Sequence, residues 1–145
     1  MDVLEDLQIG KAGEYLVCAN LILSGYVAYP SEQGLPYDVV MDFNGRLIKI
    51  QVKTTRGWRN IPQRKTPISA YVFNVKRRGK LNGNRHTKES CDVFALVALD
   101  TMEIGYLPNK DVKGTMNFRC KEQSEKLLEI NLFNINLTVI RIFTL

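Results

Sequence analysis

The chain has 145 residues, of which 45% are hydrophobic and 24% are charged, an ordinary composition for one globular domain with its own core. No apolar run approaches the ~20 residues needed to cross a bilayer, the first residues are acidic rather than signal-like, and three widely spaced cysteines with one histidine exclude a disulfide framework and a His-rich metal site. We therefore expect a single domain over residues 1–145, located in the cytoplasm.

The positive charge is concentrated in one part of the chain. Residues 53–88 contain eleven of the 20 lysines and arginines and no acidic residue, whereas the rest of the chain carries all 15 acidic residues. Aromatic residues, Gly and Pro interrupt this block, so it is not a low-complexity segment. The segregation indicates a polyanionic partner, most simply nucleic acid; the alternative is a solvated basic surface.

The first third of the chain predicts a helix followed by a hairpin. A helix is expected over residues 3–25, a short strand over 26–30, a loop over 31–36 and a hairpin over 37–55. Five apolar helix residues fall near one stripe at helical spacing: Leu4, Leu7, Val17, Cys18 and Leu21.

The rest of the chain predicts more strands. In order, these elements are a basic loop at 56–68, a strand at 69–75, a second basic loop at 76–88, an apolar strand at 91–99 that is buried on both faces, a strand at 104–107, a short helix at 121–129 and a strand at 136–145. A leading helix packed on a mixed, mainly antiparallel sheet makes an α/β protein of the α+β type.

The hairpin carries polar side chains where packing residues would be expected. Asn44-Gly45 predicts a two-residue type I′ turn, which makes Phe43 and Arg46 partners and fixes the register. One face then carries Val39, Met41, Phe43, Ile48, Ile50 and Val52, and the opposite face carries Asp38, Val40, Asp42, Leu47, Lys49, Gln51 and Lys53. Asp38 is predicted to lie across from Gln51, with Lys53 as a diagonal neighbour.

This trio of residue types suits metal-dependent chemistry. A carboxylate and an amide oxygen can bind Mg²⁺, which prefers oxygen ligands and retains several waters. An ammonium group beside them can lower the pKa of a metal-bound water or stabilise charge that develops on a phosphate. Asp38, Gln51 and Lys53 therefore predict phosphodiester hydrolysis. The alternative is a solvated polar face, which we expect for Asp42 and Lys49.

Glu14 is a candidate fourth member of the site. It precedes Val17 by three residues and follows Leu7 by seven, so it lies on or beside the apolar stripe. A carboxylate there costs free energy unless it is paired or bound to metal. We expect Glu14 to join the site; the alternative is a side chain at the stripe edge that reaches solvent.

The order of these motifs resembles the PD-(D/E)XK nuclease superfamily, which includes many type II restriction enzymes and archaeal Holliday junction resolvases. The motifs are Gly10-Lys11-Ala12-Gly13-Glu14-Tyr15 on the helix, then Tyr37-Asp38, then Ile50-Gln51-Val52-Lys53-Thr54-Thr55. They cover about residues 9–55, and the form is most like the homing endonuclease of this type found in bacterial group I introns. The resemblance implies a restriction-endonuclease-like core.

The resemblance also assigns roles by position. It implies that Asp38 is the motif aspartate, Lys53 the motif lysine and Glu14 the helix acid, and that the backbone carbonyl of Val52 completes a metal shell with Asp38, Gln51 and Glu14. Gln51 departs from the pattern, because most relatives carry an acid at that position. An amide oxygen can still bind a metal, but one negative charge is removed.

These observations predict a Mg²⁺-dependent, sequence-specific double-strand DNA endonuclease of the homing type, with Mn²⁺ as a substitute metal and Glu14, Asp38, Gln51 and Lys53 as catalytic residues. Such an enzyme would act on double-stranded DNA as a homo-oligomer, dimer or tetramer, in association with the nucleoid. The alternatives are a structure-specific Holliday junction resolvase and a DNA-binding module whose site has decayed at Gln51.

The basic block supplies the expected DNA contacts. Because Arg can pair bidentately with guanine, we expect bases to be read by Arg56, Arg59, Arg77, Arg78 and Arg85. The lysines are expected to set affinity and salt dependence. The predicted DNA-binding residues are Arg56, Arg59, Arg64, Lys65, Lys76, Arg77, Arg78, Lys80, Arg85 and Lys88.

Overall fold

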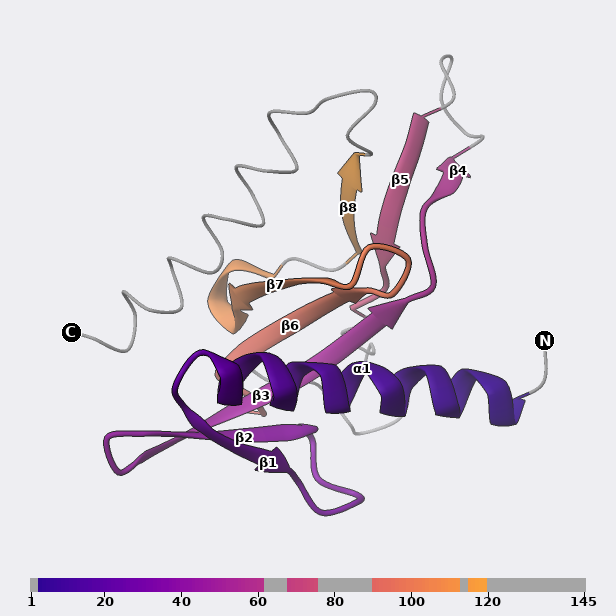
Figure 1. Ribbon diagram of the computed structural model, residues 1–145. Helices are drawn as coiled ribbons and strands as arrows, with labels where there is room; N and C mark the ends of the chain where they lie inside the picture. The colour runs from indigo at the N-terminus through magenta and orange to yellow at the C-terminus, as the bar shows by residue number, and fades with distance from the viewer. Residues whose placement is uncertain (1–2, 62–67, 76–89, 113–114, 120–145) are drawn as a thin grey trace, which may run out of the picture.

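Helix α1 crosses one face of a twisted sheet in the computed structural model of the protein (Figure 1). The structure describes residues 3–61, 68–75, 90–112 and 115–119. The predicted basic loop at 76–88, the helix at 121–129 and the strand at 136–145 lie outside the described residues. Within the described part of the chain, no helix has the length and hydropathy that a membrane crossing requires.

The described elements are α1 (Val3–Leu23), β1 (Val27–Pro30), β2 (Val39–Phe43), β3 (Arg46–Thr55), β4 (Arg59–Ile61), β5 (Ile68–Phe73), β6 (Val93–Ala98), β7 (Glu103–Pro108), a 3₁₀ turn (Asn109–Asp111) and β8 (Met116–Arg119). They form a five-stranded sheet in the order β1-β2-β3-β6-β7 and a three-stranded sheet in the order β4-β5-β8. The pairing of β3 with β6 is parallel, and the other pairings in both sheets are antiparallel. The expected helix on a mixed, mainly antiparallel sheet is confirmed.

Two short strands depart from the sequence prediction. Arg59–Ile61 forms β4 inside the segment that was predicted to be a loop, and Met116–Arg119 forms β8, which was not predicted. Both strands pair with β5, one on each side. Strands this short carry little local signal, because their stability comes from the partner strand.

The hairpin has the predicted register. Phe43 pairs with Arg46, and the ladder runs outward to Val39 and Ile50. Asn44 and Gly45 have φ values of 52° and 82°, as a type I′ turn requires. The apolar hairpin face packs on α1, where Val17, Cys18 and Leu21 join the core. The prediction that Leu7 belongs to this packed stripe is wrong.

Leu7 is 65% exposed because the first turns of α1 extend past the end of β3 (Figure 1). The Leu4 side chain is outside the described ones. At Gly13 the helix approaches β3 closely: a Cβ there would lie 1.9 Å from the Thr54 Oγ1. α1 therefore rests on the end of β3 that carries the candidate site residues.

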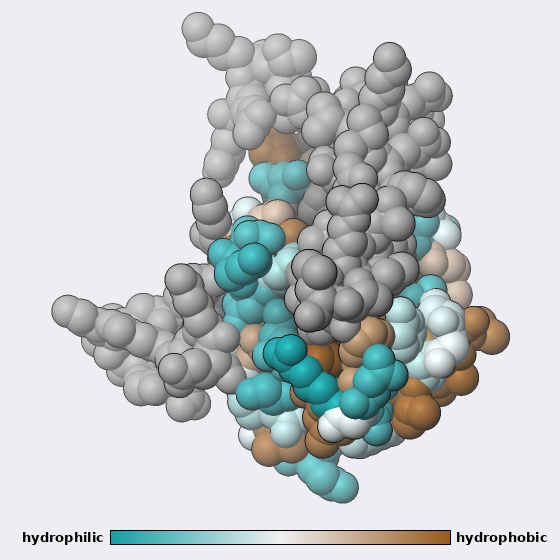
Figure 2. Space-filling model, turned by 90° about the vertical axis from the view of Figure 1, so that its left-hand side faces the viewer, coloured by the Kyte–Doolittle hydropathy of each residue, from teal (hydrophilic) through white to brown (hydrophobic). Residues whose placement is uncertain are grey.

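β6 is an interior strand, as predicted. All six of its residues are buried, and it lies between β3 and β7. At the other side of the sheet β1 is an edge strand. Figure 2 shows apolar residues gathered at the lower right of the molecule, over the C-terminal end of α1 and β1, where Ile22, Leu23 and Val27 are exposed.

Candidate active site

Asp38 stands where β2 begins and the regular ladder with β3 has ended. Its backbone N–H donates to the Ile50 carbonyl at 2.9 Å, and its Oδ2 accepts the Val52 N–H at 2.8 Å. The Asp38 carboxylate thus accepts the hydrogen bond that a backbone carbonyl would accept if the ladder continued. Burial raises the pKa of Asp38, and the charge of Glu14 adds to this, while the Val52 N–H and the Lys53 charge act in the opposite direction.

The Val52 carbonyl points to the same edge as Asp38. The N–H and C=O of one residue in an extended strand point to the same side, and the Val52 N–H meets the Asp38 carboxylate. The last regular pair of this ladder is Val39 with Ile50, so the Val52 carbonyl lies beyond the pairing with β2. This direction agrees with the ligand role that the motif implies.

Gln51 is buried and unsatisfied. The residue is 8% exposed, and its Oε1 has no hydrogen-bond partner among the described residues. An unpaired buried acceptor costs ~1–3 kcal/mol, so native proteins rarely keep one without a reason. The alternation of β3 puts Gln51 on the same face as Lys53. A bound cation would satisfy this oxygen.

Glu14 reaches the site from α1. Its side chain is 17% exposed and forms an ion pair with Lys11, one turn earlier in the helix. Glu14 and Lys11 both act on the pKa of Asp38, so helix and strand charges share one environment. The prediction did not include Lys11, although its i, i+3 spacing from Glu14 was a usable signal.

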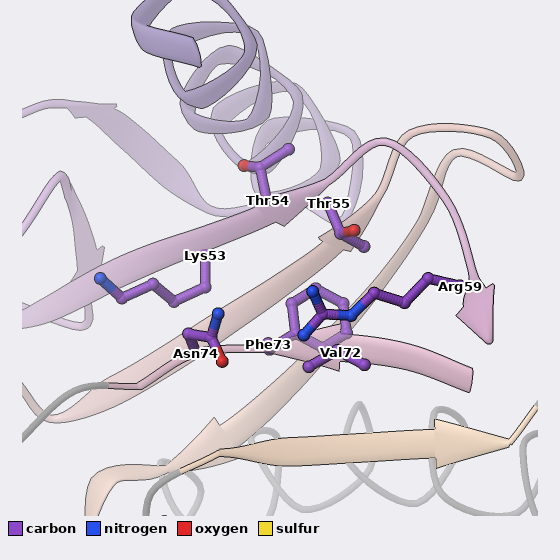
Figure 3. Close-up of a pocket in the computed structure, with 7 residues that line it drawn as sticks. All are labelled: Lys53, Thr54, Thr55, Arg59, Val72, Phe73 and Asn74. Carbon is purple, nitrogen blue, oxygen red and sulfur yellow. The ribbon is translucent and has the colours of Figure 1, made fainter. Parts of the chain in front are cut away.

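Lys53 completes the group from β3. Figure 3 shows its side chain on the side of the strand that faces Asn74, while Thr54 points toward α1. Its ammonium lowers the pKa of Asp38, which opposes the effect of burial. The structure therefore brings Glu14, Asp38 and Lys53 into electrostatic contact.

The donor set fits a hard cation. The described residues bring together no group of three or more His, Cys, Asp or Glu side chains, so a thiolate or imidazole site is not formed there. What they offer are the carboxylates of Asp38 and Glu14, the unpaired Gln51 Oε1 and the Val52 carbonyl. A few oxygen ligands that leave positions for water are what Mg²⁺ takes. The roles themselves remain predictions.

The predicted DNA-binding residues are only partly described. Arg56 is ion-paired with Glu5 of α1 at 2.7 Å, and Arg59 lines a pocket beside Lys53. The other eight lie outside the described residues: Arg64, Lys65, Lys76, Arg77, Arg78, Lys80, Arg85 and Lys88.

A helix on a mixed sheet, with an aspartate at the start of one hairpin strand and Gln-x-Lys on the next, defines a restriction-endonuclease-like nuclease fold. A family model described as PD-(D/E)XK endonuclease matches residues 5–134, and the chain belongs to this family. Comparison with curated protein sequences gives no match.

The likeness of the fold is shown by one solved structure, and a second aligns less well. The bacterial homing endonuclease I-Ssp6803I aligns with a TM-score of 0.60 at 15% identity, over 82% of this chain and 81% of that one. Hjc, a Holliday junction resolvase from the archaeal hyperthermophile Archaeoglobus fulgidus, aligns with a TM-score of 0.46 at 13% identity, over 76% of this chain and 83% of that one. The family match and the likeness to I-Ssp6803I confirm the expected family and core architecture.

Proposed function

We propose that the protein is a Mg²⁺-dependent, sequence-specific endonuclease that cleaves double-stranded DNA, of the homing type. The observation that carries the proposal is the buried Oε1 of Gln51, which has no hydrogen-bond partner among the described residues and stands where the motif resemblance implies a metal ligand. A cation bound beside Asp38 would satisfy this oxygen.

The residues divide the chemistry among them. Asp38, Gln51, Glu14 and the Val52 carbonyl would hold the cation. Mg²⁺ bound there would lower the pKa of a water and neutralise charge on the scissile phosphate. Lys53 supplies a positive charge that stabilises the attacking hydroxide and the developing phosphorane charge. The Val52 N–H fixes the Asp38 carboxylate in one orientation. The carboxylate therefore does not have to be ordered during the reaction.

The size of the chain implies assembly. One chain of 145 residues carries one such site, so we expect two copies to act together to cut both strands in one binding event. The exposed apolar residues at the end of α1 and on edge strand β1 offer a surface for self-association. The likeness to a homing endonuclease and the basic block favour a DNA target, and with it association with the nucleoid.

Cleavage of a plasmid library tests the proposal. Purified protein is incubated with supercoiled plasmids over a range of Mg²⁺ and Mn²⁺ concentrations, with Asp38→Ala as the control. We expect metal-dependent linear product with the unsubstituted protein and none with Asp38→Ala. No cutting at any metal concentration would overturn the proposal, and selective cutting of a four-way junction over linear duplex would make the protein a resolvase instead.

A further inference from the structure

An open pocket lies beside the candidate active site, between the two sheets. It has a volume of about 300 Å³, with Lys53 and Thr55 on one wall, Arg59 on another, and Phe73 and Asn74 opposite (Figure 3). Its charged lining is cationic: Lys53 comes from the large sheet and Arg59 from the small one. The pocket therefore attracts an anion.

Three side chains can donate hydrogen bonds into the pocket. They are the Lys53 ammonium, the Arg59 guanidinium and the Asn74 amide. Thr55 contributes little, because its hydroxyl already donates to the Gly57 carbonyl at 3.1 Å. The remaining donors line one pocket from both sheets. In Figure 3 the Arg59 guanidinium lies beside Phe73, and the Lys53 ammonium lies on the other side of Asn74. Charged donors of this kind bind phosphate oxygens strongly.

Arg59 is held by the small sheet and has no ion pair within the described residues. Its backbone pairs with Ala70 across β4 and β5, so a short antiparallel ladder fixes where its side chain begins. In Figure 3 the side chain extends from β4 back toward Phe73. No ion pair of Arg59 is found within the described residues, whereas Arg56 is bound to Glu5 at 2.7 Å.

We propose that this pocket binds a DNA backbone phosphate that adjoins the scissile one, with the Arg59 guanidinium as its principal ligand and the Asn74 amide as a second donor. The proposal rests on the proposed function of the neighbouring site. It gives Arg59 a positioning role in place of the base-reading role that its residue type suggested.

The pocket favours a phosphate over a base. An extruded base would need an exposed aromatic face for stacking, and Phe73 is only 5% exposed. A phosphate needs charge and a fork of donors, which Arg59 provides. Because Lys53 belongs both to this pocket and to the candidate active site, a phosphate held here would fix the adjoining one with respect to Asp38.

The salt dependence of DNA binding tests the pocket. The probe is a linear duplex that contains the cleavage site, and the protein carries Asp38→Asn to prevent cutting. Arg59→Ala is compared with Arg46→Ala, which removes the same charge from the turn end of β3, roughly 23 Å from Lys53 at the rise of an extended strand. Each phosphate contact adds about 0.9 to the slope of log K against log salt.

We expect Arg59→Ala to lower this slope by about one and Arg46→Ala to leave it unchanged. A second probe carries one neutral methylphosphonate linkage next to the scissile phosphate. It should weaken binding to the protein that retains Arg59 and not weaken binding to the Arg59→Ala variant further, because the contact is already lost.

Failure of the pocket assignment can be told apart from failure of the proposed nuclease function. Equal slopes for Arg59→Ala and Arg46→Ala, or a methylphosphonate effect that persists in Arg59→Ala, would overturn the pocket assignment and leave the nuclease function standing. Cleavage of no DNA by the unsubstituted protein would overturn both. Arg59→Lys should keep the slope but bind more weakly, since it retains the charge and loses the planar fork.

Discussion

The β2–β3 hairpin has an aspartate at its turn end and another at its open end, and the two have different surroundings. At the turn end, the Asp42 carboxylate accepts the Gly45 N–H at 2.9 Å, and Leu47 beside it is 56% exposed. At the open end, the Asp38 carboxylate accepts the Val52 N–H at 2.8 Å, and neighbouring Gln51 is 8% exposed. Both aspartates are half-buried and satisfy a backbone donor, but Asp38 lies among the charges of Glu14, Lys11 and Lys53.

The burial of the neighbouring residues and the nearby charges distinguish the open end from the turn end. α1 and β6 cover the open end, and the helix places Glu14 and Lys11 within electrostatic reach of Asp38. Desolvation there strengthens each charge interaction and leaves the Gln51 oxygen without water. The polar residues of the hairpin therefore have a structural role at the turn end and are suited to catalysis at the open end.

The largest expected effect separates the two aspartates directly. Asp38→Asn removes a metal-binding charge and should reduce the cleavage rate by at least about 100-fold, a typical loss for a group that acts on the reacting atoms. Asp42→Asn keeps a carbonyl oxygen for the Gly45 N–H and should leave the rate within about twofold. Single-turnover cleavage in Mg²⁺ measures both. Similar losses in the two variants would contradict the distinction between the two ends.

The next effect concerns the seating of α1 on the open end. Gly13→Ala would put a Cβ 1.9 Å from the Thr54 Oγ1 and within 3.1 Å of its Cβ and Cγ2, so rotation of Thr54 cannot relieve the clash. The helix must move, and we expect a loss of about 1–3 kcal/mol in the free energy of unfolding, with slower cleavage because Glu14 moves too.

Gly10→Ala is the matched control on the same helix. A Cβ at Gly10 meets nothing within 4 Å, so this substitution should stabilise the protein by about 0.5–1 kcal/mol through helix propensity alone. Urea unfolding of the two variants gives the comparison. Stabilisation by Gly13→Ala would show that α1 is not in close contact with β3.

The parts of the fold and site that depend on residues close together in the chain could be predicted from the sequence. The Asn44-Gly45 turn determines the register, and the register alone predicts that Asp38, Gln51 and Lys53 share a face, because both depend on residues near in the chain. The motif spacing likewise points to Glu14. These are the parts of fold and site that could be predicted.

The rest depends on contacts between distant segments. The exposure of Leu7 is decided by where the sheet ends under α1, and the ion pair of Arg56 with Glu5 joins residues 51 positions apart. β4 and β8 exist because β5 lies between them. That the Gln51 Oε1 has no partner among the described residues is a property of the packed interior, which no pattern of residue types reveals.

A third prediction compares two buried polar side chains. Gln51→Met removes an unsatisfied acceptor with little change in shape, so the metal-free protein should become more stable by about 1 kcal/mol while its response to Mg²⁺ is lost. Asn109 is equally buried, but its amide donates to the Cys91 carbonyl at 2.8 Å. Asn109→Leu should therefore destabilise by about 1–3 kcal/mol.

Thermal unfolding with and without Mg²⁺ measures both variants. The unsubstituted protein and Asn109→Leu should each gain stability when Mg²⁺ is added, and Gln51→Met should gain little. A Gln51→Met variant that is less stable without metal and still responds to Mg²⁺ would mean that the Gln51 oxygen has a structural role.

The smallest effect is the pH dependence that the open end gives to stability. Because the pKa of Asp38 is raised above its usual 3.8 in the folded protein, the folded state holds this proton more tightly than the unfolded chain does. The contribution is therefore fully favourable below pH 3.8 and is lost as the pH rises through the folded pKa. Asp38→Asn does not titrate, so without metal its stability relative to the unsubstituted protein should increase over that window and stay constant above it.

Urea unfolding of the two proteins across the acidic pH range, without metal, measures this difference. Added Mg²⁺ should reverse it at neutral pH, because the ionised Asp38 then gains a cation and Asp38→Asn does not. A difference between the two proteins that does not vary with pH would show that burial does not penalise the Asp38 charge. The open end of the hairpin would then be as well solvated as the turn.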